Sequence, residues 1–413
     1  MLGRTLCPMD VAGEQRASLS ADDPLGAFVS RLDVPAVSPG VLAGRSVAVK
    51  DMFDVAGVPT GAGNPRWAQT HAIPVAHATA IELLLHAGAH IVGKTVTDEL
   101  AYSLSGTNVH WGTPLNSAAP DRVCGGSSCG SASAVAGHMV DIGLGTDTGG
   151  SIRIPASYCG LVGFRPTHGR VSLRGCVPLA PRFDTVGWLT RSASLSRTAG
   201  DVLLSPVVTQ AAPPARMFVW RDALRLVETH VRDAVDGAIS RLAEAFGSAE
   251  EFTLPATELD DWADAFRTLQ GADCWRTHGE WITREHPDFG PGITARFAAA
   301  SAITTDQESV AEAVARDARR RLDDVLGDDG VIVLPSAPDV APLRNASREQ
   351  KDHIRPATLR LTCAAGLAGL PTMSVPAARS EAALPIGIAL IGARNSDEHL
   401  LRIATQLESA EAF

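Results

Sequence analysis

The chain has 413 residues, of which 45% are hydrophobic and 20% charged, and its formal net charge is −10. A chain of this length can bury a large core. A chain with this net negative charge shows no excess of basic residues to bind nucleic acid or an anionic membrane, so we expect neither as a partner. The seven cysteines form no CxxC pair. Their number and spacing argue against a disulfide framework and against a zinc site.

No targeting or membrane segment is evident in the sequence. The first residues, MLGRTLCPMDVAG, lack the apolar run of a signal peptide. The long uncharged stretch from Leu361 up to Arg379 is interrupted by Pro371 and Pro376 and makes a poor membrane span. We therefore expect a cytoplasmic globular protein, with a homodimer left open as its assembly.

The first part of the chain alternates strand and helix patterns. Residues 1–40 are interpreted as a surface leader with a short helical piece near Leu25–Arg31. The apolar run 46–50 predicts a buried strand that ends in Lys50, helical spacing covers 79–88, and 90–94 predicts a second apolar strand. The order strand, helix, strand favours a parallel βαβ unit.

The stretch 125–155 reads GGSSCGSASAVAGHMVDIGLGTDTGGSIRIP. Small residues over 131–138 predict a helix that packs closely on a sheet, and 141–146 resembles a core strand. The loop 148–151 then lies at the carboxyl end of that strand, the edge at which open α/β sheets collect their binding sites.

The second part of the chain has a different character. Long amphipathic helices are predicted over 221–246 and 307–326. Strand patterns return at 331–335 and 386–391, before a final helix near 398–408. We therefore predict one domain over 1–413, divided into the leader 1–40, a core over 41–200, a helical substrate-side excursion over 200–330 and a return to the sheet over 331–413.

Two serine clusters suggest acyl-transfer chemistry. Each follows a Gly-Gly pair: Ser127 and Ser128 in the first cluster, Ser151 in the second. Glycine lets the backbone approach a ligand closely and leaves N–H groups uncovered. Acyl transfer needs a nucleophile together with donors aimed at the developing oxyanion. The two clusters supply both kinds of group.

A serine nucleophile also needs a base. Seven histidines lie in or near this part of the chain: His71, His77, His86, His90, His110, His138 and His168. The chain has no GxSxG nucleophile elbow, so nothing points to a Ser-His-Asp hydrolase, which nevertheless stays open. Lys50 is the alternative base, because desolvation at the end of an apolar strand lowers a lysine pKa and favours the neutral amine.

Three blocks resemble the amidase signature family: AVKD at 48–51, GGSSCGSAS at 125–133 and GTDTGGSIRIPA at 145–156. The resemblance implies an α/β fold in which a large mixed β-sheet is wrapped by α-helices. It also implies a Ser–cis-Ser–Lys triad. By position in these blocks, Lys50 matches the base, Ser127 the bridging serine with a cis peptide, and Ser151 the nucleophile.

The same resemblance implies the surroundings of the triad. The oxyanion would be held by backbone N–H groups of Thr148, Gly149 and Gly150, together with that of Ser151. The supporting residues would be Ser128, Asp147 and Arg153. Neither a cofactor nor a metal is implied. Cys129 departs from the Gly or Ser that the family usually has there, which leaves a thiol nucleophile as an alternative.

Further stretches resemble the short indole-3-acetamide hydrolases within the family, among them DELAYSLSGTNVHWGTPLN at 98–116 and IPASYCGLVGFRPTHG at 154–169. They imply a small aryl- or alkyl-acetamide substrate that releases ammonia. Aromatic side chains are candidates for its pocket: Phe53, Trp111, Trp275 and Trp281. Two alternatives remain, an amidotransferase A-type subunit that works in a complex and a broader amide or ester hydrolase.

Overall fold

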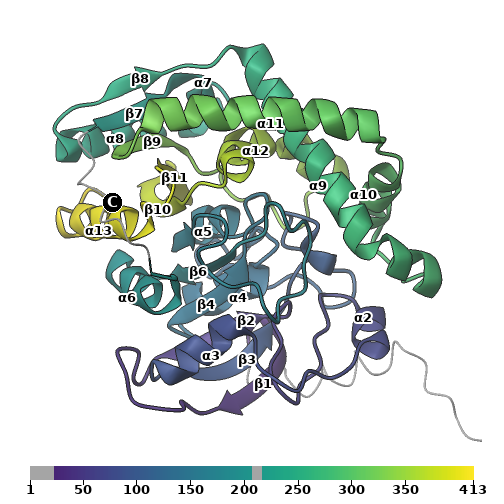
Figure 1. Cartoon of the computed structure of the whole chain (residues 1–413). Helices are drawn as coiled ribbons and strands as arrows, with labels where there is room; N and C mark the ends of the chain where they lie inside the picture. The colour runs from purple at the N-terminus through teal and green to yellow at the C-terminus, as the bar shows by residue number, and fades with distance from the viewer. Residues whose placement is uncertain (1–22, 207–215) are drawn as a thin grey trace, which may run out of the picture.

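One large mixed sheet organises the molecule. The structure is a computed structural model that describes residues 23–206 and 216–413. Within these residues, 11 strands form a sheet in the order β1-β3-β2-β4-β6-β5-β10-β11-β9-β7-β8. Neighbours pair in both directions; β2 and β3 are parallel, whereas β4 and β6 are antiparallel. Helices wrap this sheet (Figure 1), so the predicted fold class is confirmed.

The N-terminal edge of the sheet corrects one prediction. The helical piece expected near Leu25–Arg31 is wrong, because residues Phe28–Val34 form strand β1. This strand pairs antiparallel with β3 (His90–Thr95). Its side chains alternate towards and away from the protein, and backbone pairing at the sheet edge overrides the weak helical spacing of so short a segment.

The predicted βαβ unit is present. Strand β2 (Ser46–Lys50) leads through α3 (Thr79–His86) to β3, and the two strands pair in parallel. Strand β2 also pairs in parallel with β4 (Ile142–Thr146). Both strands therefore end at the same edge of the sheet, and Lys50 is the last residue of β2.

Helix α4 (Cys129–Ala136) lies against β4 at close range. The glycines of β4 permit this approach: a Cβ at Gly145 would lie 2.5 Å from the Ser128 hydroxyl, and one at Gly143 would lie 2.9 Å from the Ser131 carbonyl oxygen. Each distance is shorter than a van der Waals contact. The small residues of this stretch thus set the position of the first serine cluster over β4.

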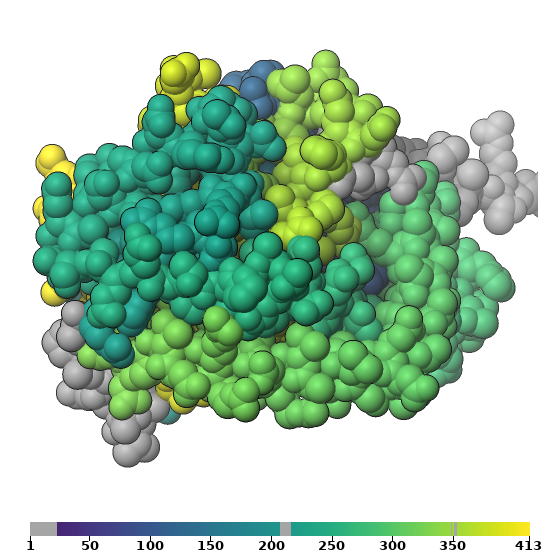
Figure 2. Space-filling view, turned by 90° about the horizontal axis from the view of Figure 1, so that it is seen from above, coloured from purple at the N-terminus to yellow at the C-terminus, as the bar shows by residue number. Residues whose placement is uncertain are grey.

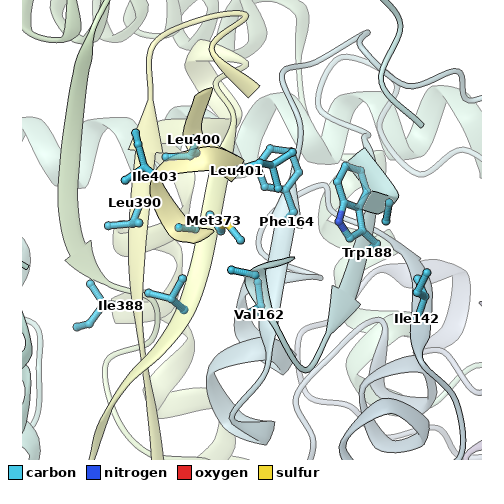
Figure 3. Close-up of a cluster of buried hydrophobic side chains, with 14 of the residues drawn as sticks. Ile142, Val162, Phe164, Trp188, Met373, Ile388, Leu390, Leu400, Leu401 and Ile403 are labelled. Atoms are coloured by element: carbon cyan, nitrogen blue, oxygen red, sulfur yellow. The ribbon is translucent and has the colours of Figure 1, made fainter. Parts of the chain in front are cut away.

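The C-terminal strands complete the middle of the sheet and a shared core. Strand β5 (Val162–Arg165) pairs with β6 (Val186–Thr190) and with β10 (Thr372–Arg379), and β11 (Pro385–Gly392) follows. Figure 3 shows Phe164 and Trp188 of the first part beside Met373 and Leu401 of the last part, in one apolar cluster. Both ends of the chain therefore build one core.

The excursion packs on both faces of its end of the sheet and also enlarges the sheet. Its amphipathic pattern does not predict strands, yet β7 (Arg216–Trp220) and β8 (Glu250–Phe252) extend the sheet beyond β9 (Gly330–Pro335). Seen from above in Figure 2, green residues of this segment form much of the surface. Its helices are α7 (Arg221–Leu224), α8 (Thr229–Phe246), α9 (Ala256–Glu285), α10 (Pro291–Ser301) and α11 (Thr305–Leu326).

The remaining helices lie between or after the strands. They are α2 (Pro65–Thr70), the 3₁₀ turn η1 (Glu99–Ala101), α5 (Arg153–Cys159), α6 (Ala193–Leu203), α12 (Arg348–Ala368) and α13 (Asp397–Ser409). Within the described residues, no helix is both long enough and apolar enough to cross a bilayer.

Candidate active site

Strands β2 and β4 are parallel and end at the same edge of the sheet. Lys50, at the end of β2, lies beside the first serine cluster. The Lys50 side chain is fully buried. Its Nζ donates hydrogen bonds to Ser127 Oγ and to Thr146 Oγ1, each at 2.7 Å. Thr146 is the last residue of β4, the neighbour of β2. The peptide bond between Gly126 and Ser127 is cis. Lys50 thus has two hydroxyl partners inside the protein.

Burial sets the protonation of this lysine. Desolvation lowers the pKa of Lys50 from 10.5 to about 8, and the charge of Asp98 is the largest influence that opposes this change. The neutral amine is therefore accessible near neutral pH, as a general base requires. Lys94 is equally buried but differs, because its Nζ lies 2.7 Å from Asp51 Oδ1 in an ion pair.

Asp98 packs against the first serine cluster. Its backbone N–H donates to the Ser127 carbonyl oxygen at 3.3 Å. Its Oδ2 accepts from Gly106 N–H at 3.1 Å and from Ser105 Oγ at 3.3 Å. Oδ1 is buried without a hydrogen-bond partner among the described residues. A Cβ at Gly126 would lie 2.7 Å from both carboxylate oxygens, so only glycine fits between Asp98 and Ser127.

The second serine cluster follows β4 and is held by a buried carboxylate. Asp147 accepts bonds from two guanidinium groups, Arg153 Nη2 at 2.8 Å and Arg165 Nη1 at 3.0 Å. Burial alone would raise the pKa of Asp147, but the charges of Arg153 and Arg165 hold it well below its usual range. Asp147 also accepts the backbone N–H groups of Gly150 at 2.9 Å and Ile152 at 3.0 Å. The loop is thus fixed around a permanent charge.

Helix α12 and a second carboxylate hold the same loop. Thr362 Oγ1 donates to the Gly149 carbonyl oxygen at 2.8 Å, and Thr148 Oγ1 donates to Asp184 Oδ1 at 2.6 Å. Gly150 has φ of +123°, a conformation that favours glycine. Among the described residues, no acceptor takes the backbone N–H of Thr148, Gly149 or Ser151. Those three donors are available to a ligand.

The two serine clusters touch each other at the end of a cavity. Ser128 N–H donates to the Ser151 carbonyl oxygen at 3.3 Å, and Ser128 Oγ donates to the Thr146 carbonyl oxygen at 3.3 Å. Ser151 lines a cavity with a volume of about 20 Å³. The residues around this cavity are Ala101, Tyr102, Ser103, Leu104, Gly149, Ser151, Gln270, Arg355 and Leu359.

The structure brings the predicted site residues together. Lys50 bonds to Ser127 and to Thr146 at the end of β4. The loop that follows Thr146 begins with Asp147 and carries Ser151, whose carbonyl oxygen accepts the N–H of Ser128. Sequence reasoning missed several neighbours that depend on long-range packing. They are Asp98, Thr146, Arg165, Asp184, Gln270, Arg355 and Thr362. Asp98 stands within the block 98–116 quoted above, and Thr146 within 145–156, so motif position alone could have singled out these two.

The thiol and the aromatic candidates find less support. Burial raises the pKa of Cys129 well above its usual value, and its Sγ faces the Val96 carbonyl oxygen at 3.4 Å, which disfavours a thiolate. Among the described residues, none of the four proposed aromatic side chains lines the cavity at Ser151. Phe53 is a core residue, and Trp281 packs edge-on against Trp67.

The amidase family profile matches residues 30–401 of the chain. The chain therefore belongs to the amidase signature family and is an amide hydrolase of that class. The chain is 35% identical over 426 residues to Amidase 1 of Arabidopsis thaliana, an alignment that covers 94% of this chain and 99% of that protein. Among solved structures it resembles the crystal structure of an amidase, with 29% identity, a TM-score of 0.82 and coverage of 98% and 96% of the two chains.

The family also contains components of larger enzymes. The chain is 30% identical to the A-type subunit of the glutamyl-tRNA(Gln) amidotransferase of Halobacterium salinarum, over 93% of this chain and 99% of that protein. Family membership therefore establishes amide chemistry, whereas the substrate and the roles of individual residues have to be argued from the site.

Proposed function

We propose that the chain hydrolyses the C–N bond of a small carboxamide, with Ser151 as nucleophile, Ser127 as proton relay and Lys50 as base. One observation carries this proposal: the 2.7 Å hydrogen bond from a desolvated Lys50 to Ser127 Oγ. The next residue, Ser128, contacts Ser151, which lines a cavity. A neutral lysine can accept a proton through a bridging hydroxyl, and a serine alone is too weak a nucleophile at neutral pH.

The proposed reaction has two halves. Ser151 Oγ attacks the amide carbon while its proton passes to Ser127 Oγ, whose own proton passes to neutral Lys50. The developing oxyanion accepts hydrogen bonds from backbone N–H groups. We assign Thr148, Gly149 and Ser151 as these donors. Gly150 was also expected among them, but its N–H already donates to Asp147.

Collapse of the tetrahedral intermediate breaks the C–N bond. The protonated Lys50 returns its proton through Ser127 to the leaving nitrogen, and ammonia departs from an ester of Ser151. Water then attacks the ester, again with its proton taken through the relay, and releases the carboxylate. The products are one carboxylate and one ammonia for each amide and water consumed. Ser128, Asp147 and Arg153 hold the loops in position.

The sequence resemblance to indole-3-acetamide hydrolases makes indole-3-acetamide a candidate substrate within this class. A second candidate function is that of an amidotransferase A-type subunit, favoured by the 30% identity to the Halobacterium salinarum protein along almost its whole length. We further propose that the protein acts in the cytoplasm, alone or as a homodimer, on free small amides.

Ammonia release from a panel of small amides and matched esters tests the proposal. The purified chain should release ammonia from at least one small amide without any partner protein. Hydroxylamine added during turnover should divert the acyl group to a hydroxamate, because an acyl-enzyme ester is open to that nucleophile. Absence of turnover on every small amide, with activity restored only by the other proteins of an amidotransferase, would favour the second function.

A further inference from the structure

Three cavities meet around one arginine beside the candidate nucleophile. Arg355 of α12 lines the small cavity at Ser151, and it also lines both neighbouring cavities. The larger neighbour, between α9, α10 and α12, has a volume of about 460 Å³ and shares Tyr102 and Gln270 with the Ser151 cavity. Because the walls are shared, the cavities are compartments of one site that opens away from Ser151.

The compartments have different capacities. The cavity at Ser151, at about 20 Å³, has room for one or two water molecules. A carboxamide group fits that scale, whereas a bulky acyl group does not. The rest of a substrate therefore has to extend past Tyr102 and Arg355 into the larger compartment.

The charged groups on the cavity walls all have one sign. They are Arg267, Arg296 and Arg355, and no Asp or Glu lines any of the three cavities among the described residues. This contrasts with the net charge of −10 of the whole chain. Arg267 is exposed and pairs with Asp264 at 3.0 Å. Arg296 and Arg355 are partly buried, and each of them lines at least two of the three cavities.

Both guanidinium groups converge on the same part of the wall. Arg296 Nη1 donates to the Tyr102 carbonyl oxygen at 2.9 Å, which anchors it beside the passage between the compartments. Both cations also act on the Tyr102 hydroxyl: burial raises the pKa of Tyr102, and the charges of Arg355 and Arg296 oppose that rise. The positive charges of Arg296 and Arg355 therefore act at Tyr102, beside the passage that leads to Ser151.

The remaining wall is mostly apolar, and its side chains are small rather than aromatic. The larger compartment is lined by glycines, alanines, Thr268, Gln270, Ile303 and Pro356, with Tyr102 as its one aromatic residue among those described. An indole ring would find little stacking surface there. A carboxylate, by contrast, needs a paired cation once it leaves water, and a planar guanidinium offers two parallel donors to it.

We propose that the preferred substrates are carboxamides whose acyl chain carries a carboxylate, with that carboxylate bound by Arg355 and supported by Arg296. This inference rests on the proposed amide hydrolysis and names its substrate class. The reaction cleaves only the amide bond: a half-amide of a dicarboxylic acid plus water gives the dicarboxylate and ammonia. The distal carboxylate takes no part in the chemistry and serves to orient the chain.

Matched pairs of amides test the inference on the intact chain. Glutaric acid monoamide is compared with pentanamide, and succinic acid monoamide with butanamide, with indole-3-acetamide as the neutral aryl amide. We expect the acid amides to have a kcat/KM about 10–100-fold above their neutral partners, the range expected of a hydrogen bond to a charged group. Glutarate should also inhibit competitively at concentrations where pentanoate does not.

Variants of the arginines assign the preference to these residues. Arg355→Gln should bring the acid-to-neutral ratio close to one, mainly through a higher KM for the acid amide, and Arg355→Lys should restore part of it. Arg296→Gln should lower the ratio less. Arg320→Gln removes an exposed arginine on α11 and serves as the matched control, which should keep the wild-type ratio. Circular dichroism verifies that each variant is folded.

The outcomes separate this inference from the proposed function. If neutral amides are hydrolysed as well as or better than acid amides, the substrate class is wrong while amide hydrolysis stands. If the preference exists but survives in both Arg355→Gln and Arg296→Gln, the assignment to these cavities is wrong. If no small amide is hydrolysed by the wild-type chain, the proposed function fails and this inference fails with it.

Discussion

Lys50 Nζ and Ser127 Oγ lie 2.7 Å apart, although the two residues are separated by 77 positions in the sequence. The contact exists because β2 and β4 run in parallel and α4 packs closely over β4. Neither residue has the other as a local neighbour. The bond depends on the sheet, and the proposed catalysis depends on the bond.

Replacement of Ser151 by alanine should abolish turnover. We expect kcat to fall by about 10³–10⁶, as for the loss of a nucleophile that acts as part of a triad, with no loss of folded structure. Amide turnover and the melting temperature measure the two effects.

The matched control is Cys129→Ala, which removes the other candidate nucleophile. This variant should keep its activity, since the thiol is buried and its pKa raised. Wild-type activity in Ser151→Ala combined with an inactive Cys129→Ala would reverse the assignment.

The pH dependence of activity should report Lys50. Because the base has to be neutral, kcat/KM should be low in acid, rise as pH passes through about 8 and level off above it, following the lowered pKa of Lys50. Lys50→Met should lower kcat/KM by about 10²–10⁴ and should also remove the rise in kcat/KM near pH 8. A profile that is flat between pH 6 and 9 in the wild-type enzyme would contradict a lysine base.

Asp98→Asn should shift the pH at which kcat/KM rises. The Asp98 carboxylate is the largest influence that raises the Lys50 pKa against desolvation. Its removal should therefore lower the Lys50 pKa and move the half-maximal pH of kcat/KM downwards. The neighbouring Glu99→Gln is the control, because Glu99 bonds to Asn64 and not to the triad. An unchanged midpoint in Asp98→Asn would show that its charge does not reach Lys50.

Asp147→Asn should destabilise the protein strongly. It leaves the buried Arg153 and Arg165 without their carboxylate, and breaking a buried pair typically costs about 3–5 kcal/mol. The exposed pair of Arg320 and Asp317 is the control, and Asp317→Asn should cost less than about 1 kcal/mol. Chemical denaturation at pH 7 measures both values. Equal small losses would mean that the loop does not depend on Asp147.

The same carboxylate gives stability a defined pH dependence. The pKa of Asp147 is held well below its usual range in the folded state, whereas an unfolded Asp titrates near pH ~4. Its contribution is therefore complete above that pH and is lost as pH falls below it. The difference in unfolding free energy between wild type and Asp147→Asn should shrink in acid. A difference that stays constant down to pH 2 would contradict this linkage.

Local patterns were enough to predict the proposed chemistry but not its surroundings. Gly-Gly-Ser blocks and a lysine at the end of an apolar strand are visible in the sequence, so Lys50, Ser127 and Ser151 could be singled out together. Their roles stay predictions until variants are measured. The edge strand β1 was mistaken for a helix because only its pairing with β3 decides between the two.

Residues on distant elements could not be found in this way. Gln270 of α9 and Arg355 of α12 carry no local motif, and they become neighbours of Ser151 only when the excursion and the last third of the chain pack over the sheet. The role of Arg165 likewise depends on Asp147, which it contacts from β5, two strands away from β4 in the sheet. Substrate selection therefore belongs to the part of the fold that sequence periodicity leaves undetermined.

Helix α12 carries two groups with different duties seven residues apart. Thr362 Oγ1 donates to the Gly149 carbonyl oxygen of the loop that carries Ser151, and Arg355 lies two turns earlier on the same helix, directly before Pro356. At about 1.5 Å per residue the separation along the axis is about 10 Å. With the substrate carboxylate bound by Arg355 as proposed, this spacing limits which acyl chains reach both Ser151 and the guanidinium group. Graded chain length, rather than charge alone, should then govern which half-amide the enzyme prefers.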